Sequence, residues 1–320
     1  MTHDTCVLAM DAGQTGIRSR LLYGDRTKAR AVEPPAVEPG EFPGVFTDRP
    51  VLPQLAAVAM ESLSGQPAHE SQQVTLAIGS SGLTDDMTAQ ALLELLADSP
   101  ISTVHLAHDS ITSYLGALGD VTGAVVAAGT GVVTLAVGDS EVSRVDGWGH
   151  LLGDAGSGYW IGRAALEAVM RAHDGRGPAT SLTAPAQAEF ADLEGAYMVL
   201  QGDENKVSRV AAWARVVDEH AEAGDEVCRQ VLLRAGQELA ISVAAGLANV
   251  GQASRPRVAT LGKVFGSATV RQSFTDELDA RLGSFELTAA HSTGLDGAAV
   301  LPTVTTTSAL ATRIRTAGKA

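Results

Sequence analysis

Cysteines and basic residues are scarce in this chain of 320 residues, and each shortage excludes a class of protein. Cys6 and Cys228 lie far apart and outside any C-x-x-C pair, which excludes a disulfide framework and a cysteine metal site. Two unpaired cysteines in apolar segments predict core residues and a cytoplasmic protein. The net charge of −14 argues against nucleic-acid and anionic-membrane partners, because both favour a basic surface.

Long apolar runs and Walker-type loops are missing as well. Without an apolar run of about 18 residues, the sequence predicts no membrane span. The opening MTHDTCVLAMDAG has no basic segment before its apolar stretch, so we expect no signal peptide. The absence of G-x-x-x-x-G-K-[ST] excludes a P-loop fold, so backbone N–H groups and Mg²⁺ would have to hold any nucleotide.

The first part of the chain alternates strand-like and helix-like segments. The apolar run 6–10, the turn DAGQTG and the segment 17–24 predict an opening β-hairpin. The stretch 31–50 holds five prolines and reads as a loop. Periodicity then predicts helices at 51–63, 85–97 (with Thr84 or Asp85 near its cap) and 110–118, and strands at 73–79 and 101–106. This order indicates an α/β domain with a mixed sheet.

A second hairpin pattern begins at Gly123. The segments LAMDAGQTGIRSRLL and VVAAGTGVVTLAV both read as strand, Gly/Thr turn and strand, and GDSEVSRV adds a further turn and strand. Such repetition predicts two related domains, each with one Gly/Thr turn, separated near 119–122. The later segments predict helices over most of 185–250, at 268–282 and from 294, strands at 257–266 and 284–289, and a tail at 303–320.

The stretch 146–163, DGWGHLLGDAGSGYWIGR, concentrates aromatic and glycine residues in a chain with only 4% aromatics. Its second half predicts the start of an amphipathic helix, and its first half a glycine-rich loop. Trp148 could be the platform for a sugar ring or a buried core residue in a turn, and the sequence leaves both interpretations open.

These motifs carry a resemblance. GWGHLLGDAGSGYWIGR, with DAGQT at 11–15 and GTG at 129–131, resembles the N-acetylglucosamine kinases in the BadF/BadG/BcrA/BcrD branch of the sugar kinase–Hsp70–actin superfamily. The resemblance implies two actin-like ATPase (ribonuclease H-like) domains, each with a mixed β-sheet flanked by helices, and a cleft between them. The domains would be 1–119 and 120–320, with a helical insertion at about 160–250 and a final tail packing on the first domain.

The resemblance assigns ATP and Mg²⁺ to named residues. Asp11 would hold Mg²⁺ through water, because Mg²⁺ favours carboxylates and phosphates as ligands. The two Gly/Thr turns and the adenosine-side loop would bind ATP through Gly13, Gln14, Thr15, Gly129, Thr130, Gly131, Gly262 and Lys263. Each turn alone is a weak motif, because Asp and Gly are common in any turn.

Asp109 is the residue expected to act on the sugar that accepts the phosphate. By resemblance Asp109 is the general base for the sugar hydroxyl, while by local sequence it reads equally as a helix N-cap. Further sugar contacts implied by the family come from Ser81, Gly82, Thr130, Trp148, Gly153 and Asp154. A carboxylate at Asp154 that accepts two hydroxyl hydrogen bonds would give specificity for a sugar. His108 and His150 are expected to be structural.

Three departures from the family pattern affect specificity. The stretch VEPGEFPGVFTDRP lacks an Asn, the second phosphate turn continues as VVT without the usual Ser and Asn, and Lys263 replaces a glycine. The sequence therefore predicts an ATP-dependent kinase for the 6-hydroxyl of an amino sugar, N-acetylglucosamine or a relative such as glucosamine or N-acetylmuramic acid. Family members are commonly dimers, which makes a homodimer an expectation. The alternatives are a BadF-type ATPase activator, for which clustered cysteines are missing, and a non-catalytic sugar sensor.

Overall fold

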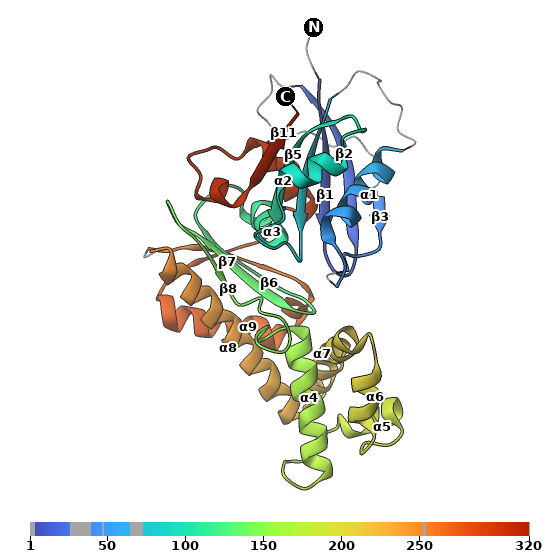
Figure 1. Ribbon diagram of the computed structural model, residues 1–320. Helices are drawn as coiled ribbons and strands as arrows, with labels where there is room; N and C mark the ends of the chain where they lie inside the picture. Colours follow the sequence, from blue (N-terminus) through green and yellow to red (C-terminus); the bar gives the residue numbers. More distant parts are fainter. Residues whose placement is uncertain (1–3, 26–39, 47, 65–72, 252–253, 320) are drawn as a thin grey trace. The chain divides into compact units, whose positions relative to one another are not determined.

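Two β-hairpins, one near the start of the chain and one after residue 122, begin two separate sheets (Figure 1). The computed structural model describes residues 4–25, 40–46, 48–64, 73–251 and 254–319. Unit 1 contains the described residues up to Val121, Asp139–Glu141 and the chain from Ala289 onward, and unit 2 contains Thr122–Gly138 and Val142–Thr288. The predicted second domain ran to residue 320 with its tail packing on the first domain, and in the structure the chain from Ala289 onward belongs to unit 1.

Unit 1 is built on a six-stranded mixed sheet in the order β11-β5-β4-β1-β2-β3. Its strands are β1 (Asp4–Ala12), β2 (Ile17–Asp25), β3 (Gly40–Phe42), β4 (Val74–Ser80), β5 (Ile101–His108) and β11 (Arg315–Gly318). Its helices are α1 (Val51–Leu63), α2 (Ala89–Leu95), α3 (Asp109–Leu118) and α10 (Gly294–Val300), followed by the 3₁₀ segments η2 (Leu301–Thr303) and η3 (Ala309–Arg313). β1, β4 and β5 run parallel, so their carboxyl ends lie at one edge.

Unit 2 is built on a five-stranded sheet in the order β10-β9-β6-β7-β8. Its strands are β6 (Gly123–Ala128), β7 (Val132–Val137), β8 (Val142–Val145), β9 (Arg257–Leu261) and β10 (Glu286–Thr288). Its helices are α4 (Gly158–His173), α5 (Thr183–Phe190), α6 (Ala196–Gly202), α7 (Lys206–Glu222), α8 (Glu226–Asn249) and α9 (Ala268–Leu282), with the 3₁₀ segment η1 (Lys263–Gly266).

The two sheets repeat one topology. In each, the first two strands form an antiparallel hairpin, the third pairs antiparallel with the second, and the fourth and fifth add in parallel beside the first. Unit 1 adds β11 antiparallel to its fifth strand. The internal repeat in the sequence is therefore a repeat of strand order, and the relation between the two halves is confirmed.

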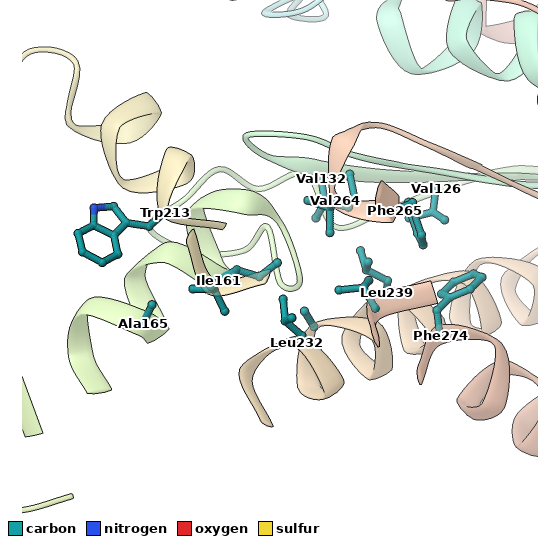
Figure 2. Close-up of a cluster of buried hydrophobic side chains, with 14 of the residues drawn as sticks. Val126, Val132, Ile161, Ala165, Trp213, Leu232, Leu239, Val264, Phe265 and Phe274 are labelled. Carbon is teal, nitrogen blue, oxygen red and sulfur yellow. The ribbon is translucent and has the colours of Figure 1, made fainter. Parts of the chain in front are cut away.

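Each unit has its own hydrophobic core. In unit 1, Leu8 and Met10 of β1 pack with apolar side chains of α1 and α2, while Ala9 and Leu22 pack on α10 at the opposite face. In unit 2, side chains of β6 and β7 pack with α4, α7, α8 and α9 (Figure 2). Alternate residues of one strand point to opposite faces, so helices can cover both faces of the first sheet.

Helix α8 is the longest helix in the described ranges, and its amphipathic pattern is weak. By length and apolar composition alone it could cross a membrane, but half of that stretch is buried inside the unit. Cys228, Leu232, Leu239 and Val243 of α8 all belong to the core of unit 2. Such burial is typical of the central helix of a globular domain.

Several predicted boundaries need correction. The helix predicted at 85–97 begins at Ala89, because the Thr88 side chain accepts a hydrogen bond from Ala91 N–H and caps it. The segment 257–266, predicted as a strand that ends in a Gly-flanked turn, forms β9 up to Leu261 and then the turn η1. The tail predicted at 303–320 contains β11. Residues 31–39 of the proline-rich loop and 37–39 and 47 of the stretch without Asn lie outside the described residues.

Candidate active site

The turn between β1 and β2 presents Gly13, Gln14 and Thr15. Gly13 N–H donates to Gly16 O at 3.1 Å, and Gly13 O accepts from Val45 N–H at 3.0 Å, so the turn is closed on itself and held from the side. Gln14 and Thr15 are exposed at its tip. A tight turn of this kind is a suitable place for an anion.

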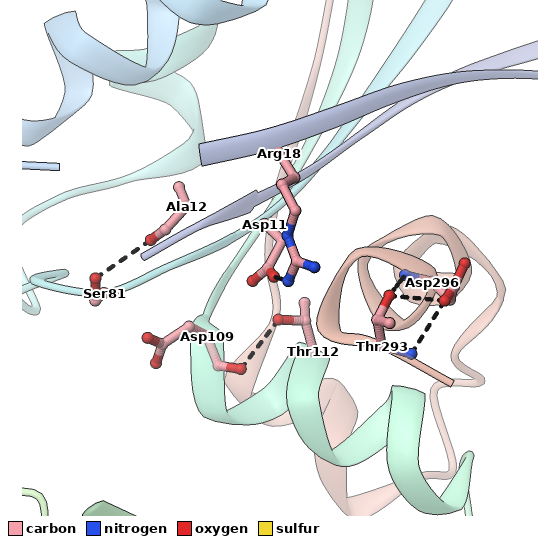
Figure 3. A network of polar contacts seen from close by, with 8 residues as sticks. All are labelled: Asp11, Ala12, Arg18, Ser81, Asp109, Thr112, Thr293 and Asp296. Carbon is pink, nitrogen blue, oxygen red and sulfur yellow. Dashed lines mark hydrogen bonds and ion pairs between the residues drawn. The ribbon is translucent and has the colours of Figure 1, made fainter. Parts of the chain in front are cut away.

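Asp11 lies at the end of β1 with its side chain only 16% exposed (Figure 3). Its Oδ2 accepts a hydrogen bond from the Arg18 guanidinium of β2 at 2.6 Å. Burial raises the pKa of Asp11, and the nearby Asp109 carboxylate acts in the same direction, while Arg18 opposes both. The sequence did not single out Arg18, although residues facing each other across a hairpin can be expected to pair.

Asp109 is the first residue of α3, at the carboxyl end of β5 (Figure 3). Its Oδ1 lies 2.8 Å from His108 Nδ1, and its main-chain carbonyl accepts a hydrogen bond from Thr112 Oγ1 at 3.0 Å. The interpretation of Asp109 as the N-cap is wrong, because His108 occupies that position and its Nδ1 accepts from Ser110 N–H. The Asp109 carboxylate is therefore not used as a helix cap.

Ser81 connects the carboxyl ends of β4 and β1. Its N–H and its hydroxyl both donate to Ala12 O, at 2.9 and 3.2 Å, and Gly82 follows with φ of 72° (Figure 3). The register pairs Ala12 with Ser80 and Ser80 with His108. Unit 1 therefore brings Asp11, Ser81 and Asp109 to one edge of its sheet, where open α/β sheets commonly bind ligands.

The Gly129–Gly131 turn joins β6 to β7 in unit 2. Gly129 N–H donates to Gly131 O at 2.9 Å, and the carbonyls of Gly129 and Thr130 accept from Gly158 N–H and Tyr159 N–H at 2.8 and 3.0 Å. The first two residues of α4 thus hold the turn in place. These bonds also satisfy N–H groups that the first turn of a helix leaves without partners.

Asp146 organises the loop that precedes α4. Its two carboxylate oxygens accept from Asp154 N–H at 2.7 Å and Ala155 N–H at 2.9 Å. Gly153 lies directly against the Asp146 carboxylate and Trp148. Asp154 takes a left-handed conformation with φ of 59°, which is costly for a non-glycine residue and is maintained here by these two hydrogen bonds. No role of Asp146 is evident from the sequence motifs alone.

Asp154 is 92% buried, since only 8% of its surface is exposed. Burial raises its pKa and the charge of Asp146 adds to this, while N–H groups of Gly149 and Val132 and the His150 ring act in the opposite direction. His150 is half-buried and its ring lies 4.8 Å from that of Tyr159, in agreement with the structural role expected for it. Asp154 thus faces a set of donors beside the Gly129–Gly131 turn.

Trp148 is 62% exposed, and Arg144 lies over its ring at 4.7 Å. The interpretation of Trp148 as a buried core residue is therefore wrong. Leu151 and Leu152 of the same loop are also exposed. A flat, exposed aromatic face next to a buried carboxylate has the chemical character of a carbohydrate site.

Gly262 and Lys263 begin η1 at the end of β9. Gly262 has φ of 94°, and a Cβ atom there would lie 2.1 Å from Ala128 O, immediately before the Gly129 turn. Only glycine fits this position. Lys263 is exposed. The described residues contain no group of three or more metal-binding side chains, and a single carboxylate such as Asp11 is the usual protein contribution to a Mg²⁺–nucleotide site.

Comparison with known proteins identifies the family of the chain. Residues 63–301 match one family of ATPases across most of the chain. The chain belongs to the BadF/BadG/BcrA/BcrD ATPase family. The family resemblance inferred from the motifs at 11–15, 129–131 and 147–163 is confirmed.

Two curated relatives match the chain over different lengths. The N-acetyl-D-glucosamine kinase of Dictyostelium discoideum is 35% identical over 159 residues, which are 46% of this chain and 47% of that protein. The N-acetylmuramic acid/N-acetylglucosamine kinase of Clostridium acetobutylicum is 28% identical over 201 residues, which are 60% of this chain and 64% of that protein. The chain thus spans about half to two thirds of the curated relatives it matches.

Among solved structures, a proposed N-acetylglucosamine kinase from Chromobacterium violaceum has a TM-score of 0.72 at 25% identity, covering 93% of this chain and 98% of that chain. This similarity confirms the predicted fold class, in which each unit has a mixed sheet flanked by helices. The family is one of ATPases, so ATP is the nucleotide that the family uses.

Proposed function

We propose that the chain is an ATP-dependent sugar kinase that phosphorylates the 6-hydroxyl of an amino sugar, N-acetylglucosamine or a relative such as glucosamine or N-acetylmuramic acid. The observation that carries this proposal is the pair of carboxylates Asp11 and Asp109 at the carboxyl ends of β1 and β5, the two strands on either side of β4, in a member of an ATPase family. The names of the kinases from Dictyostelium discoideum and Clostridium acetobutylicum support the choice of sugar.

In this proposal Asp109 is the general base. Its carboxylate would accept the proton of the sugar 6-hydroxyl as that oxygen attacks the γ-phosphorus, and the bond to the ADP oxygen breaks. Gln14 and Thr15 and the turn Gly129–Gly131 would bind the phosphate oxygens, with Gly13 closing the first turn. The turn at Gly262 and Lys263 would contact the nucleoside or the phosphates. Asp11 would hold Mg²⁺, which neutralises charge on the phosphates when bound.

The sugar would be bound by the loop around Asp154. Its buried carboxylate would accept hydrogen bonds from two sugar hydroxyls, the exposed Trp148 ring would stack on the sugar, and Gly153, Thr130, Ser81 and Gly82 would complete the contacts. Specificity follows because a sugar without those hydroxyls would leave a buried carboxylate without partners. We further propose that the enzyme is cytoplasmic, with no nucleic-acid or membrane partner, as its two free buried cysteines and net charge of −14 support. We also propose that it is a homodimer, on the family resemblance alone.

The test is ADP release from ATP with and without Mg²⁺, against N-acetylglucosamine, glucosamine, N-acetylmuramic acid, N-acetylmannosamine and glucose. Stimulation by one sugar names the acceptor. Asp109→Asn should lower the sugar-dependent rate by roughly 10²–10⁴-fold, because the variant cannot accept the proton. The matched control is Asp98→Asn, which removes an exposed carboxylate from the same unit.

Two results would contradict the proposal. Sugar-independent ATP hydrolysis would favour an ATPase activator, and sugar binding without phosphoryl transfer would favour a sensor. Unchanged sugar-dependent turnover in Asp109→Asn, at an unchanged melting temperature, would remove Asp109 from the mechanism. The activator would also need a cysteine-bound cluster, whereas Cys6 and Cys228 are both buried and free.

A further inference from the structure

Unit 2 contains a cavity that the proposed reaction does not use. It has a volume of about 590 Å³ and lies among α4, α5, α6 and α7. Arg163, Leu166 and Met170 line it at helical spacing along one face of α4, with Phe190 of α5 and Leu200 of α6 across from them. The volume is in the range of small-molecule sites, roughly 300–1,000 Å³.

The wall formed by Phe190 is fixed in place, which keeps the cavity from collapsing. The Phe190 ring stacks on Trp213 with a centroid distance of 6.5 Å, and the Arg209 guanidinium lies over its ring at 5.1 Å. Arg209 is itself bonded to Glu189 at 2.7 Å and Asp203 at 3.0 Å. A ring that contacts both Trp213 and Arg209 cannot rotate into the neighbouring space without breaking these contacts.

Two exposed cations line the cavity. Neither Arg163 nor Lys206 makes an ion pair within the described residues, although Lys206 lies near enough to Asp203 to lower the pKa of that carboxyl. Of the other arginines of these helices and their connections, Arg176, Arg209 and Arg215 are each paired with a carboxylate, and Arg171 donates to the Arg176 carbonyl. The one acidic lining residue, Glu167, lies near another cation, since Asp174 and then Glu167 raise the pKa of Arg176.

We propose that this cavity binds a small organic anion with an apolar, flat body and one acidic group. The apolar lining would take the body of the ligand, and Arg163 and Lys206 would pair with its anionic group. Tyr159 and Tyr197 also line the cavity and offer hydroxyl donors. This assignment does not depend on the proposed kinase reaction, because binding is measured directly.

A main-chain hydrogen bond connects the cavity lining to the Gly129–Gly131 turn. Tyr159, which lines the cavity with its side chain, donates its main-chain N–H to Thr130 O at 3.0 Å. A ligand that restrains the first turns of α4 therefore also restrains a turn assigned to ATP. This gives the site a regulatory character.

A pair of fluorescent probes separates the two parts of the proposed ligand. Anilinonaphthalene sulfonate has an apolar body with a sulfonate, and phenylnaphthylamine has the same body without the charge. Titration of the full chain should give saturable binding of both, with the sulfonate bound more tightly and weakened by salt. Saturating ATP should leave the sulfonate bound, because the cavity is not the nucleotide site.

Substitutions test which residues of the cavity bind the two probes. Arg163→Gln combined with Lys206→Gln should weaken the sulfonate about five-fold and change the neutral probe less than two-fold, since two partly exposed ion pairs are lost. Arg215→Gln, which removes a cation of α7 outside the lining, should change neither. Leu200→Trp, which adds bulk to the wall, should weaken both probes. Unchanged melting temperatures show that each variant is folded.

Several outcomes would overturn the proposal: no saturable binding, displacement of the sulfonate by ATP, or equal loss of both probes in the double Gln variant. Tyr197, Met198 and Val199 of α6 are exposed near the cavity, so a second copy of the chain could cover it instead. In that case the dimer seen by sedimentation would dissociate in a Tyr197→Ser variant, and probe binding would fall as the chain concentration rises.

Discussion

At the scale of single residues, the loop before α4 depends on one carboxylate that organises another. Asp146 accepts two consecutive N–H groups and keeps Asp154 in a left-handed conformation inside the unit. Both effects act on Asp154: its position depends on hydrogen bonds to Asp146, and its pKa is raised by burial and then by the charge of Asp146. Asp146 is therefore a positioning residue for the proposed sugar ligand.

Replacing Asp146 by Asn should separate position from charge. Asn keeps one acceptor oxygen and turns an NH₂ group toward the second N–H, so unit 2 should lose roughly 1–3 kcal/mol of stability. The KM for the sugar should rise more than kcat falls. Because the charge that raises the pKa of Asp154 is gone, the acidic limb of kcat/KM should move to lower pH.

Steady-state kinetics across pH, with Asp139→Asn as a matched exposed control, would check this result. A variant that loses stability but keeps both its KM and its pH profile would show that Asp146 serves only the fold of the loop. An acidic limb displaced to higher pH would contradict the assigned direction of the charge effect.

A second residue-scale prediction concerns Gly294, at the start of α10. A Cβ atom there would lie 3.0 Å from Asp11 Oδ1 and 3.1 Å from Oδ2. Gly294→Ala should favour the helix by up to about 1 kcal/mol while displacing the Asp11 carboxylate. We therefore expect unchanged or slightly higher thermal stability together with weaker Mg²⁺ binding, so that half-maximal turnover requires a higher Mg²⁺ concentration.

Titration of activity with Mg²⁺, compared with a melting curve, checks the Gly294 prediction. Gly297→Ala is the contrasting variant, because its Cβ would lie 1.8 Å from Thr112 O, a main-chain atom. That substitution should lower stability outright. If Gly294→Ala binds Mg²⁺ like the unaltered chain, Asp11 tolerates the methyl group and the prediction is wrong.

At the scale of elements, α8 is fixed at its first residue by a dense hydrogen-bond network. The Asp225 carboxylate caps the helix by accepting from Cys228 N–H at 3.0 Å, and it also accepts from Thr180 Oγ1, Ser181 N–H and Ser181 Oγ at 2.6–2.8 Å. Burial tends to raise the pKa of Asp225, but these bonds outweigh it and hold the pKa well below its usual range. One side chain thus joins the start of α8 to the segment before α5.

Asp225→Ala should destabilise unit 2 by roughly 1–2 kcal/mol, the usual cost of losing an N-cap. The contribution of Asp225 should be pH-dependent: the folded-state pKa lies below the unfolded value, so its stabilisation is present above pH of about 3.9 and is lost as pH falls through the folded pKa. Urea unfolding at pH 7 and pH 3 would measure both effects. A larger difference between variant and parent at pH 3 than at pH 7 would contradict the prediction.

At the scale of the whole molecule, the chain consists of two units with separate cores and one shared strand order. Unit 1 is completed by the last segment of the chain: β11 pairs antiparallel with β5, and Arg315 Nη1 donates to Thr84 O at 2.9 Å and Met87 O at 2.5 Å. Lys319 N–H donates to Ser102 O at 2.8 Å. Residues far apart in sequence are therefore needed for one sheet.

Ending the chain after Arg313 should destabilise unit 1 by roughly 2–4 kcal/mol, because several hydrogen bonds of β11 are lost, and should leave unit 2 unchanged. The two cysteines report on the units separately. Burial raises the pKa of Cys6 in unit 1 to about 11 and, with Asp225, that of Cys228 in unit 2 to about 12, so both thiols are protected in the folded chain.

Alkylation in moderate urea, followed by peptide mass spectrometry, would measure the opening of each unit. Cys6 should be labelled earlier in the shortened chain, while Cys228 should react as in the parent. A chain that lacks only Ala320 is the control. Simultaneous labelling of both cysteines at the same urea concentration would show that the two units unfold together.

Much of the architecture follows from local sequence. The boundaries of α1 and α9 match the predicted 51–63 and 268–282, because each helix carries its own apolar periodicity and Ser267 caps α9. The two hairpins are local as well, since a Gly/Thr turn between apolar strands determines its own pairing. The turns that present Thr15 and Thr130 could therefore be identified from the sequence.

Other features were decided only by tertiary structure. The segment that forms β11 has little strand pattern and becomes a strand because β5 offers it an unpaired edge. Local sequence made Asp109 a cap, but the cap is His108, and Trp148 became exposed because its loop turns back on Asp146. The sequence by itself determined the two repeated hairpins and the motifs that indicate the family, because each of these consists of residues that follow one another in the chain. Which carboxylates are buried, paired or free depends on residues brought together from distant segments, and only the folded units decide that.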